Sequence, residues 1–443
     1  MARKMKDSGI EWIGEIPEGW EVAPVRSCFD EVRTKNTDGQ EQNALQFKSG
    51  NIISKANFNA NIDDYVADTI TNYTVVLPDT VMINGLNLNY DFKSLRVALV
   101  KEKGVITSAY LAIFPDRKKI FPQYATYLFK GYETKMAFHN MGAGIRKTLG
   151  YKEFKNQPLL LPSKEEQNKI SAYLDSKCSH IDTMLFRTRS GIEEYKKLKQ
   201  AVITQAVTKG VRGEREMKDS KIDYIGQIPD EWVLCKLRNI GDAQNGISKS
   251  SDFFGKGTPF VSYSDVYKNY SLPFSVSGLV ESTPAEQERY SVKEGDIFFT
   301  RTSETIEEVG YSCVCEKDIP HATFAGFLIR VRPFSDKLYT PYAKYYFRSS
   351  HLRFYLVKEM NLVTRASLGQ SLLKSMPVLL PSLEEQKEIA DYLDAKCTEI
   401  NGLIAKKEQL VKELESYKKS LIYEVVTGKR EIFTDITRKF PNI

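Results

Sequence analysis

The sequence contains one segment of eighteen residues twice. The first copy, from Leu161 to Cys178, reads LPSKEEQNKISAYLDSKC, and the second, from Leu380 to Cys397, reads LPSLEEQKEIADYLDAKC. Twelve of the eighteen positions are identical. A second pair of segments begins at Met5 with MKDSGIEWIGEIPEGW and at Met217 with MKDSKIDYIGQIPDEW, and ten of its sixteen positions are identical. The chain is therefore a tandem duplication.

Fainter matches between these segments extend the duplication along most of the 443 residues. LPDTVMIN at Leu77 matches KEGDIFFT at Lys293, and YATYLF at Tyr124 matches YAKYYF at Tyr342. The ends of each copy stay similar while the middle diverges, which indicates one scaffold with two different inserts. Roughly 150 residues per domain gives two or three domains for this length. We expect two parts that each join a retained motif to an insert, and two helical arms, with the boundaries 1–160, 161–211, 212–379 and 380–443.

The longer retained segments predict two long helices with matching start signals. Ser163 and Glu166 have the spacing of a capping box, in which hydroxyl and carboxylate each satisfy a free backbone amide at the helix start. Ser382 and Glu385 repeat this spacing in the second copy. Both helices are therefore expected to begin with a reciprocal cap.

An imperfect heptad stripe follows each helix start, with residues spaced alternately four and three apart. Gly210 and Gly428 follow the stripes and predict the helix ends. Breaks near Ser179 or Gly402 stay open alternatives. The expected seam positions are Ile181, Leu185, Thr188, Ile192, Tyr195, Lys199, Val202 and Ala206 in the first copy, and Ile400, Ile404, Lys407, Val411, Leu414, Lys418, Leu421 and Val425 in the second.

A helix with such a stripe needs an apolar partner, and we expect the two helices to form an antiparallel coiled coil with each other. Residues 164–209 carry nine basic and six acidic side chains, and residues 383–428 carry seven basic and ten acidic ones. The net charges of +3 and −3 favour this pairing, although each exposed ion pair contributes little. The alternative is that each helix packs only on its own globular unit.

The diverged inserts, about 23–160 and 233–379, predict mixed α/β globular units. They are rich in Tyr, Phe, Asn, Ser, Thr and Gly, and short β-type runs such as SLRVALV, IFFT and FLIRVR lie between turns. The expected fold class is α+β: two mixed α/β globular domains with two long helices in an antiparallel coiled coil, arranged as a pseudo-twofold tandem repeat.

Motifs that would indicate catalysis are missing from the sequence. The six cysteines form no CxxC pair and the four histidines are scattered, which argues against a zinc site. Gly142-Ala143-Gly144 lacks the third glycine of a dinucleotide fingerprint, and no Asn-Pro-Pro-aromatic motif of adenine methyltransferases occurs. No run of about 18 apolar residues and no signal segment is present, so we expect a cytoplasmic protein. The sequence predicts no catalytic residue, no metal and no cofactor in this chain.

Recognition of an anionic partner is the remaining interpretation. The net charge is +6, and Lys and Arg neutralise phosphates while Asn, Gln and Arg read base edges. Four loops combine these residue types with aromatic and small polar side chains, although an Asn/Gly-rich loop is more often only a turn. The candidate DNA-binding residues are Asn84, Asn87, Asn89, Tyr90, Arg146, Lys147, Gln244, Asn245, Lys249, Arg301, Thr302, Ser303 and Arg365.

Two of these candidates occupy equivalent positions in the copies. Arg146 and Arg365 are 219 residues apart, and each precedes a Leu-Gly pair by three residues. A shared phosphate contact would explain why an arginine persists in otherwise diverged inserts. A structural salt bridge is the competing explanation.

The retained Leu-Pro-Ser-x-Glu-Glu-Gln segments, the Ile-Gly and Ile-Pro motif before each insert, and the two diverged inserts together resemble the specificity subunits of type I restriction–modification systems. The resemblance covers essentially the full length. It implies two target-recognition domains and an antiparallel pair of long helices that docks two methyltransferase (modification) subunits. A translocating restriction subunit would join the complex, and S-adenosylmethionine, ATP and Mg would belong to the partners.

The resemblance also implies a function for a non-catalytic chain. Each target-recognition domain would read one half of an asymmetric, split sequence in double-stranded DNA, and the helices would set the spacing of the halves. Because the Met217 motif follows the first helix, we expect the Met5 motif to dock near Gly428, which makes the two chain ends neighbours. The alternative function is a non-enzymatic coiled-coil protein-interaction scaffold, which would lack salt-dependent DNA binding.

Overall fold

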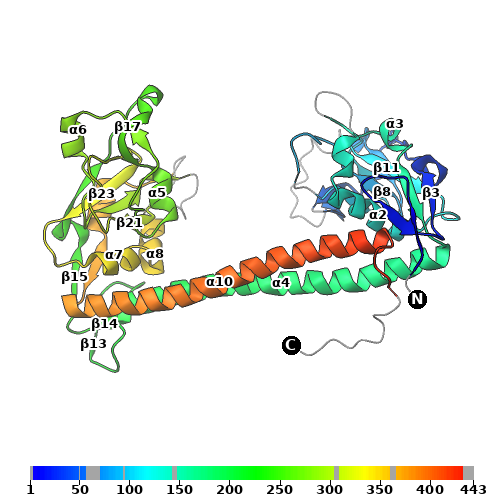
Figure 1. Ribbon diagram of the computed structural model, residues 1–443. Helices are drawn as coiled ribbons and strands as arrows, with labels where there is room; N and C mark the ends of the chain where they lie inside the picture. Colours follow the sequence, from blue (N-terminus) through cyan, green and yellow to red (C-terminus); the bar gives the residue numbers. More distant parts are fainter. Residues whose placement is uncertain are drawn as a thin grey trace. The chain divides into compact units, whose positions relative to one another are not determined.

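The computed structural model describes residues 3–48, 50–55, 70–92, 95–141, 147–303, 309–359 and 366–432. The chain divides into two compact units (Figure 1). Unit 1 consists of Met1–Arg189 and Gln409–Ile443, and unit 2 consists of Ser190–Glu408. Both units contain globular α+β structure, as the sequence predicts, together with a stretch of each long helix.

The two long helices are continuous. Helix α4 spans Lys164–Lys209 and helix α10 spans Leu383–Val426, so neither breaks near Ser179 or Gly402 (Figure 1). Gly210 and Gly428, just beyond the helix ends, have φ angles of +79° and +70°. These left-handed conformations suit glycine because it has no Cβ, so the predicted stop signals are confirmed.

Within each unit the stretches of α4 and α10 run antiparallel. In unit 1, Lys418 Nζ lies 2.6 Å from Asp182 Oδ1. In unit 2, Lys199 Nζ donates a hydrogen bond of 2.9 Å to Asn401 Oδ1. The same register continues with the pair Arg189 and Glu415 in unit 1 and with the pair Tyr195 and Lys407 in unit 2. Residues later in α4 contact residues earlier in α10, so the predicted antiparallel pairing is confirmed.

The predicted heptad seam coincides with the inward-facing positions of the two helices. All sixteen seam residues are buried or half-buried. The alternative interpretation is also partly correct, because the first turns of each helix pack into a globular core. Ile170 and Leu174 of α4 belong to the core of unit 1, and Ile389 and Leu393 of α10 belong to that of unit 2. Each helix therefore packs both on its globular unit and on the other helix.

The globular part of unit 1 is built on a four-stranded antiparallel sheet in the order β4-β11-β8-β9, with helix α2 packed against it. These elements span Phe29–Glu31 (β4), Leu111–Pro115 (β11), Val81–Ile83 (β8), Val97–Leu99 (β9) and Pro122–Thr134 (α2). The remaining elements are β1 (Met5–Asp7), β2 (Glu15–Pro17), β3 (Glu21–Pro24), β5 (Leu45–Lys48), β6 (Asn51–Ser54), β7 (Thr74–Val76), β10 (Gly104–Ile106), α3 (Tyr151–Phe154) and β12 (Pro158–Leu161).

Unit 2 repeats this sheet in the order β16-β23-β19-β21, with helix α7 in place of α2. These elements span Gly241–Asn245 (β16), Leu328–Pro333 (β23), Ile297–Thr300 (β19), Ser312–Val314 (β21) and Thr340–Tyr346 (α7). The remaining elements are β13 (Met217–Asp219), β14 (Gln227–Pro229), β15 (Val233–Lys236), β17 (Phe254–Val261), α5 (Tyr263–Lys268), β18 (Leu279–Val280), α6 (Pro284–Arg289), β20 (Thr302–Ser303), β22 (Thr323–Phe324), α8 (Ser350–Glu359), β24 (Ala366–Ser367), α9 (Gln370–Ser375) and β25 (Pro377–Leu380).

The start of α4 is tied to the Met5 motif through a buried tryptophan. Trp20, which is 1% exposed, donates its indole N–H to Glu166 Oε2 at 3.0 Å, and Arg3 pairs with Glu166 Oε1 at 2.6 Å. Ser163 Oγ accepts the Glu166 backbone N–H at 3.3 Å, as a cap should. The predicted return bond from the Glu166 carboxylate to Ser163 is wrong, because the tryptophan and the arginine bind that carboxylate instead.

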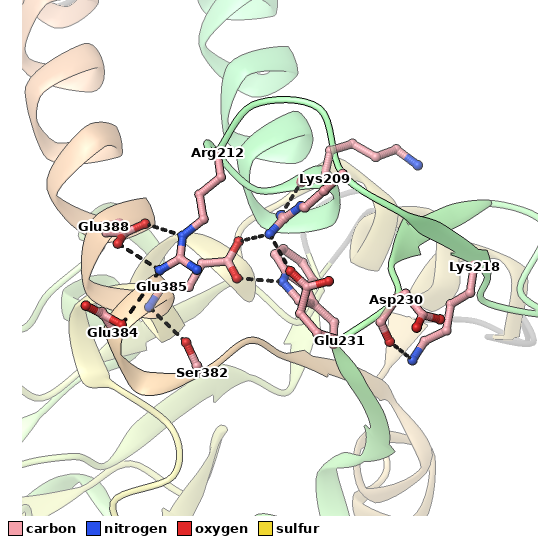
Figure 2. A network of polar contacts seen from close by, with 11 residues as sticks. Lys209, Arg212, Lys218, Asp230, Glu231, Ser382, Glu384, Glu385 and Glu388 are labelled. Carbon is pink, nitrogen blue, oxygen red and sulfur yellow. Dashed lines mark hydrogen bonds and ion pairs between the residues drawn. The ribbon is translucent and has the colours of Figure 1, made fainter.

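The start of α10 repeats this arrangement in unit 2 (Figure 2). Trp232 donates to Glu385 Oε2 at 3.0 Å, and Arg215 Nη1 lies 2.6 Å from Glu385 Oε1. Ser382 Oγ accepts the backbone N–H of Glu385 at 3.2 Å, while the tryptophan and the arginine again bind the carboxylate. We call each set of Trp, Glu and Arg an anchor: Trp20, Glu166 and Arg3 in unit 1, and Trp232, Glu385 and Arg215 in unit 2.

The glutamine of the Glu-Glu-Gln motif joins each helix start to the globular part. Gln167 Oε1 accepts the Phe121 backbone N–H at 2.8 Å, and its amide donates to Lys119 O at 3.2 Å. Gln386 does the same with Tyr339 and Lys337, at 2.8 and 2.9 Å. Both glutamines are buried, and a buried backbone group without a partner is costly. These bonds explain why a polar motif persists in both copies.

The end of α10 docks on the Met5 motif, as predicted. A Cβ on Gly428 would lie 2.3 Å from Pro17, and Tyr423 donates its hydroxyl to Trp12 O at 2.9 Å. The Arg3 backbone N–H donates to Glu431 Oε1 at 3.1 Å. The two ends of the described chain are therefore neighbours within unit 1.

We predict that Glu385→Gln destabilises unit 2 by roughly 3 kcal/mol, because it leaves Arg215 facing a neutral group in a buried pair. Glu384→Gln is the matched control, since the Glu384 side chain is 84% exposed and 3.9 Å from Arg212. Urea denaturation followed by circular dichroism measures both. Hydrogen exchange should rise in residues 217–236 and not in residues 5–24. Equal effects of the two substitutions would contradict the anchor.

Candidate nucleic-acid interface

Two candidate loops of unit 1, which are far apart in the sequence, lie side by side. Leu149 N–H donates to Gly85 O at 2.9 Å, and Leu88 N–H donates to Lys147 O at 3.1 Å. A Cβ at Gly85 would lie only 2.5 Å from Leu149 O, so the close approach requires glycine. The loop after β8 and the segment before α3 therefore form one surface.

The candidate side chains on this surface differ in their exposure. Tyr90 is 71% exposed, and Asn87 is exposed with a φ angle of +54°. Lys147 is also exposed. Asn84 uses its side-chain oxygen locally, to accept the Leu86 backbone N–H at 3.2 Å. Asn89 is half-buried. Tyr90, Asn87 and Lys147 therefore offer the most accessible groups.

A buried arginine holds this loop from beneath. Arg96 is 1% exposed and donates from Nη1 to Asn84 O and Leu86 O, both at 2.9 Å, and from Nη2 to Asp91 O. Sequence reasoning missed this role, although an arginine inside the apolar run SLRVALV was a visible signal. A buried cation needs several acceptors, and here the loop carbonyls supply them.

A partly buried carboxylate on α2 completes the support. Glu133 Oε1 accepts the Arg96 backbone N–H at 2.5 Å. Burial raises the pKa of Glu133 to about 7, although this hydrogen bond and the charges of Arg96 and Lys130 oppose the rise. Glu133 therefore titrates near neutral pH directly beneath the loop that carries Asn87 and Tyr90.

Unit 2 presents the equivalent surface with different side chains. Leu368 N–H donates to Arg301 O at 2.7 Å, which corresponds to the bond from Leu149 to Gly85 in unit 1. Thr302 pairs with Ser367 where β20 meets β24. The loop after β19 and the segment before α9 thus lie together, as the loop after β8 and the segment before α3 do in unit 1.

Three candidates of unit 2 bind other protein groups. Gln244 accepts from Arg330, Asn245 Oδ1 accepts from Gln370 Nε2 at 3.0 Å, and Lys249 pairs with Glu286 at 2.8 Å. Arg301, which follows β19, and Thr302, which begins β20, are half-buried. In the part of the chain that the structure describes, the Arg301 guanidinium has no hydrogen-bond or ion-pair partner.

Two further candidates, Arg146 and Arg365, lie outside the described residues, and the side chain of Ser303 lies outside them as well. The contact that these two arginines would share therefore stays a prediction. Within the described ranges, no group of three or more His, Cys, Asp or Glu residues could hold a metal ion. No helix among the described residues combines the length and the apolar character needed to cross a bilayer.

Comparison with known proteins agrees with this architecture. A family model described as the type I restriction modification DNA specificity domain matches residues 229–413. The specificity subunit of the type I enzyme MjaVIII from Methanocaldococcus jannaschii is 24% identical over 94% of this chain and 93% of its own length. The specificity subunit of EcoKI from Escherichia coli is 23% identical over 90% of this chain and 88% of its own.

Along most of its length the chain is similar to type I restriction enzyme specificity subunits. A chain from a solved type I restriction–modification system has the same fold, with a TM-score of 0.69 and 16% identity over 94% of this chain and 99% of that chain. The predicted resemblance and fold class are confirmed. The names of these relatives and of the matched domain agree with the expectation of a DNA specificity subunit.

We predict that Glu133→Gln makes the stability of this protein less dependent on pH. Glu133 has a pKa of about 7 in the folded state against an ordinary value of 4.5, so the folded state retains a proton that the unfolded chain loses. This stabilisation is complete below about pH 4.5 and is lost as pH rises through about 7.

Between about pH 5 and about pH 8, the free energy of unfolding of Glu133→Gln should therefore rise relative to that of the wild type by up to about 3 kcal/mol. Urea denaturation at both pH values measures the gain. Glu165→Gln is the control, because the side chain of Glu165 is 77% exposed. A difference between wild type and Glu133→Gln that does not change with pH would contradict the prediction.

Proposed function

We propose that this chain is the sequence-specific DNA-binding specificity subunit of a type I restriction–modification complex. Each globular unit, as a target-recognition domain, reads one half of an asymmetric split target in double-stranded DNA. The observation that supports this most is the pair of equivalent loop surfaces. Equivalent backbone hydrogen bonds hold Gly85 in unit 1, from the Leu149 N–H, and Arg301 in unit 2, from the Leu368 N–H. Two loop surfaces with equivalent backbone arrangements and different side chains suit two different half-sites.

The chemistry of the surfaces favours DNA over a protein partner. Asn87, Tyr90 and Lys147 in unit 1 and Arg301 in unit 2 combine base-reading, stacking and phosphate-neutralising groups. The net charge of +6 adds a weak general attraction to a polyanion. Arg146 and Arg365 would add phosphate contacts at equivalent places in the two units.

The helical arms α4 and α10 carry the second part of the proposal. They would set the spacing of the half-sites and dock two methyltransferase subunits at equivalent places, because the helix starts and their anchors repeat. Restriction and translocase subunits would join through that complex. S-adenosylmethionine, ATP and Mg would be bound by these partners, and an adenine in each half would be flipped out of the duplex for methylation.

Methylome sequencing of cells with and without the chain tests this function. We expect one split motif with two unlike halves to lose its methylation when the chain is absent. A complex purified with its methyltransferase partner should bind duplex DNA with an affinity that falls steeply as salt rises. No lost motif and no salt-dependent binding would instead favour a coiled-coil protein-interaction scaffold.

We predict that Asn87→Gly weakens binding to the unit 1 half-site by about 1–3 kcal/mol without unfolding the protein. Glycine keeps the left-handed backbone of Asn87, at a φ angle of +54°, and removes only the amide. The defect should appear on targets whose unit 1 half is intact and vanish on targets mutated in that half.

Asp79→Gly is the matched control for this variant. Asp79 also has a positive φ angle, +76°, and lies at the opposite end of β8 from the loop. Its replacement should leave discrimination within the unit 1 half unchanged. Binding by the complex in competition with mutated duplexes measures both variants. Equal losses would show that Asn87 has no base-reading role.

A further inference from the structure

Arg301 is the point at which the two loop surfaces differ most. Val81 lies opposite Leu99 on β9, and the corresponding residue Ile297 lies opposite Val314 on β21, so β8 and β19 occupy the same place in their sheets. The residue that accepts the bond from Leu149 or Leu368 is glycine in unit 1 and arginine in unit 2. Unit 1 therefore has no side chain at this position, whereas unit 2 has a guanidinium group.

The backbone of Arg301 is held on both sides. Its N–H donates to Phe327 O at 2.9 Å, and its carbonyl accepts the Leu368 N–H at 2.7 Å. The preceding strand β19 is completely buried, and the following residue Thr302 pairs with Ser367. A side chain on such a fixed backbone is presented with little loss of backbone entropy when it binds.

The other cations beside this sheet already have protein partners. Arg330 donates to Ser291 O at 2.6 Å, Arg332 pairs with Asp296 at 2.6 Å, and Lys374 pairs with Asp242 at 3.0 Å. Within the described ranges the Arg301 guanidinium makes no such bond. Five guanidinium donors that no described protein group uses are available to an outside acceptor.

An exposed aromatic ring accompanies this arginine. Phe327, whose carbonyl binds the Arg301 backbone, is 64% exposed. A phosphate contact needs only a positive charge, whereas a base edge beside an apolar ring suits the planar guanidinium of an arginine, which can donate two parallel hydrogen bonds. Bidentate donation to O6 and N7 of guanine is the commonest specific contact of arginine in the major groove.

We infer that Arg301 is a specificity-determining residue that reads a guanine in the unit 2 half-site. Unit 1 makes no equivalent contact, because a side chain at Gly85 would collide with Leu149. This inference rests on the proposed function, since it assumes that unit 2 reads DNA. It assigns one base identity to one side chain and explains part of the asymmetry of the target.

The test is selection of bound sequences from a randomised duplex library by the complex with its methyltransferase partner. The wild type should require guanine at one position of one half. Arg301→Ala should lose about 10- to 100-fold of the preference at that position and keep all other preferences. Arg301→Gln should shift the preference from guanine towards adenine, because Gln pairs with adenine N6 and N7.

Lys256→Ala is the control for loss of charge in the same unit, since the Lys256 side chain is 62% exposed on β17. It should leave the selected sequence unchanged. If Arg301→Ala weakens all sequences equally and lowers the salt dependence, the arginine contacts a phosphate and the inference is wrong. Unchanged selection by both Arg301 variants would also overturn it.

The design separates the two levels of the proposal. If the wild-type complex selects no sequence, the proposed function fails. If it selects a split target and Arg301 does not affect the base preference, only the assignment of Arg301 fails. Retained selection in the unit 1 half shows that each Arg301 variant is folded and assembled.

Discussion

The buried contact among tryptophan, glutamate and arginine is the interaction on which each unit depends. Glu385 is 1% exposed, and its carboxylate receives both the Trp232 indole and the Arg215 guanidinium. A carboxylate at such depth is tolerated only with paired donors. The bond also joins the first turn of α10 to the segment that follows the β13–β14 hairpin. Unit 1 makes the same contact at the start of α4.

Repetition of this contact separates what is retained from what diverges. The anchors and the Gln167 and Gln386 bonds occupy the base of each globular part, where the helices start. Substitutions there would disturb a packed and hydrogen-bonded junction. The loops after β8 and β19 are held mainly through backbone groups, as the bond from Leu368 to Arg301 illustrates. Backbone bonds constrain side-chain identity little, so the side chains of this candidate surface can change while its backbone arrangement stays the same.

The helical seam was predictable because it depends on local spacing. All sixteen seam positions turned inward, from Ile181 to Val425, since heptad periodicity alone selects a face of a helix. The reciprocal cap at Ser163 was wrong because the partner of Glu166 is Trp20, 146 residues earlier. Local spacing carries no information on such a partner. The persistence of both residues in both copies was the available signal.

The candidate recognition surface was predictable only at the level of loops. The residue types of the loops selected segments that the structure brings together. They could not distinguish Lys249, which is paired to Glu286, from Arg301, which the described structure leaves without a partner. That distinction depends on which acid folds beside which base. Arg96 was missed because its hydrogen-bond acceptors are carbonyls of a loop, which the residue types of the loop do not reveal.

The division of the chain into units also has a consequence for its synthesis. Unit 2 is a continuous stretch, Ser190–Glu408, whereas unit 1 needs Met1–Arg189 together with Gln409–Ile443. A ribosome therefore delivers the whole of unit 2 before it delivers the last helical stretch of unit 1. Unit 1, whose first part is synthesised first, is therefore completed last. The side chains of Ile181 and Leu185 stay exposed to solvent until Leu421 and Val425 have been synthesised. Nascent chains stalled before residue 409 should be the aggregation-prone species of this protein.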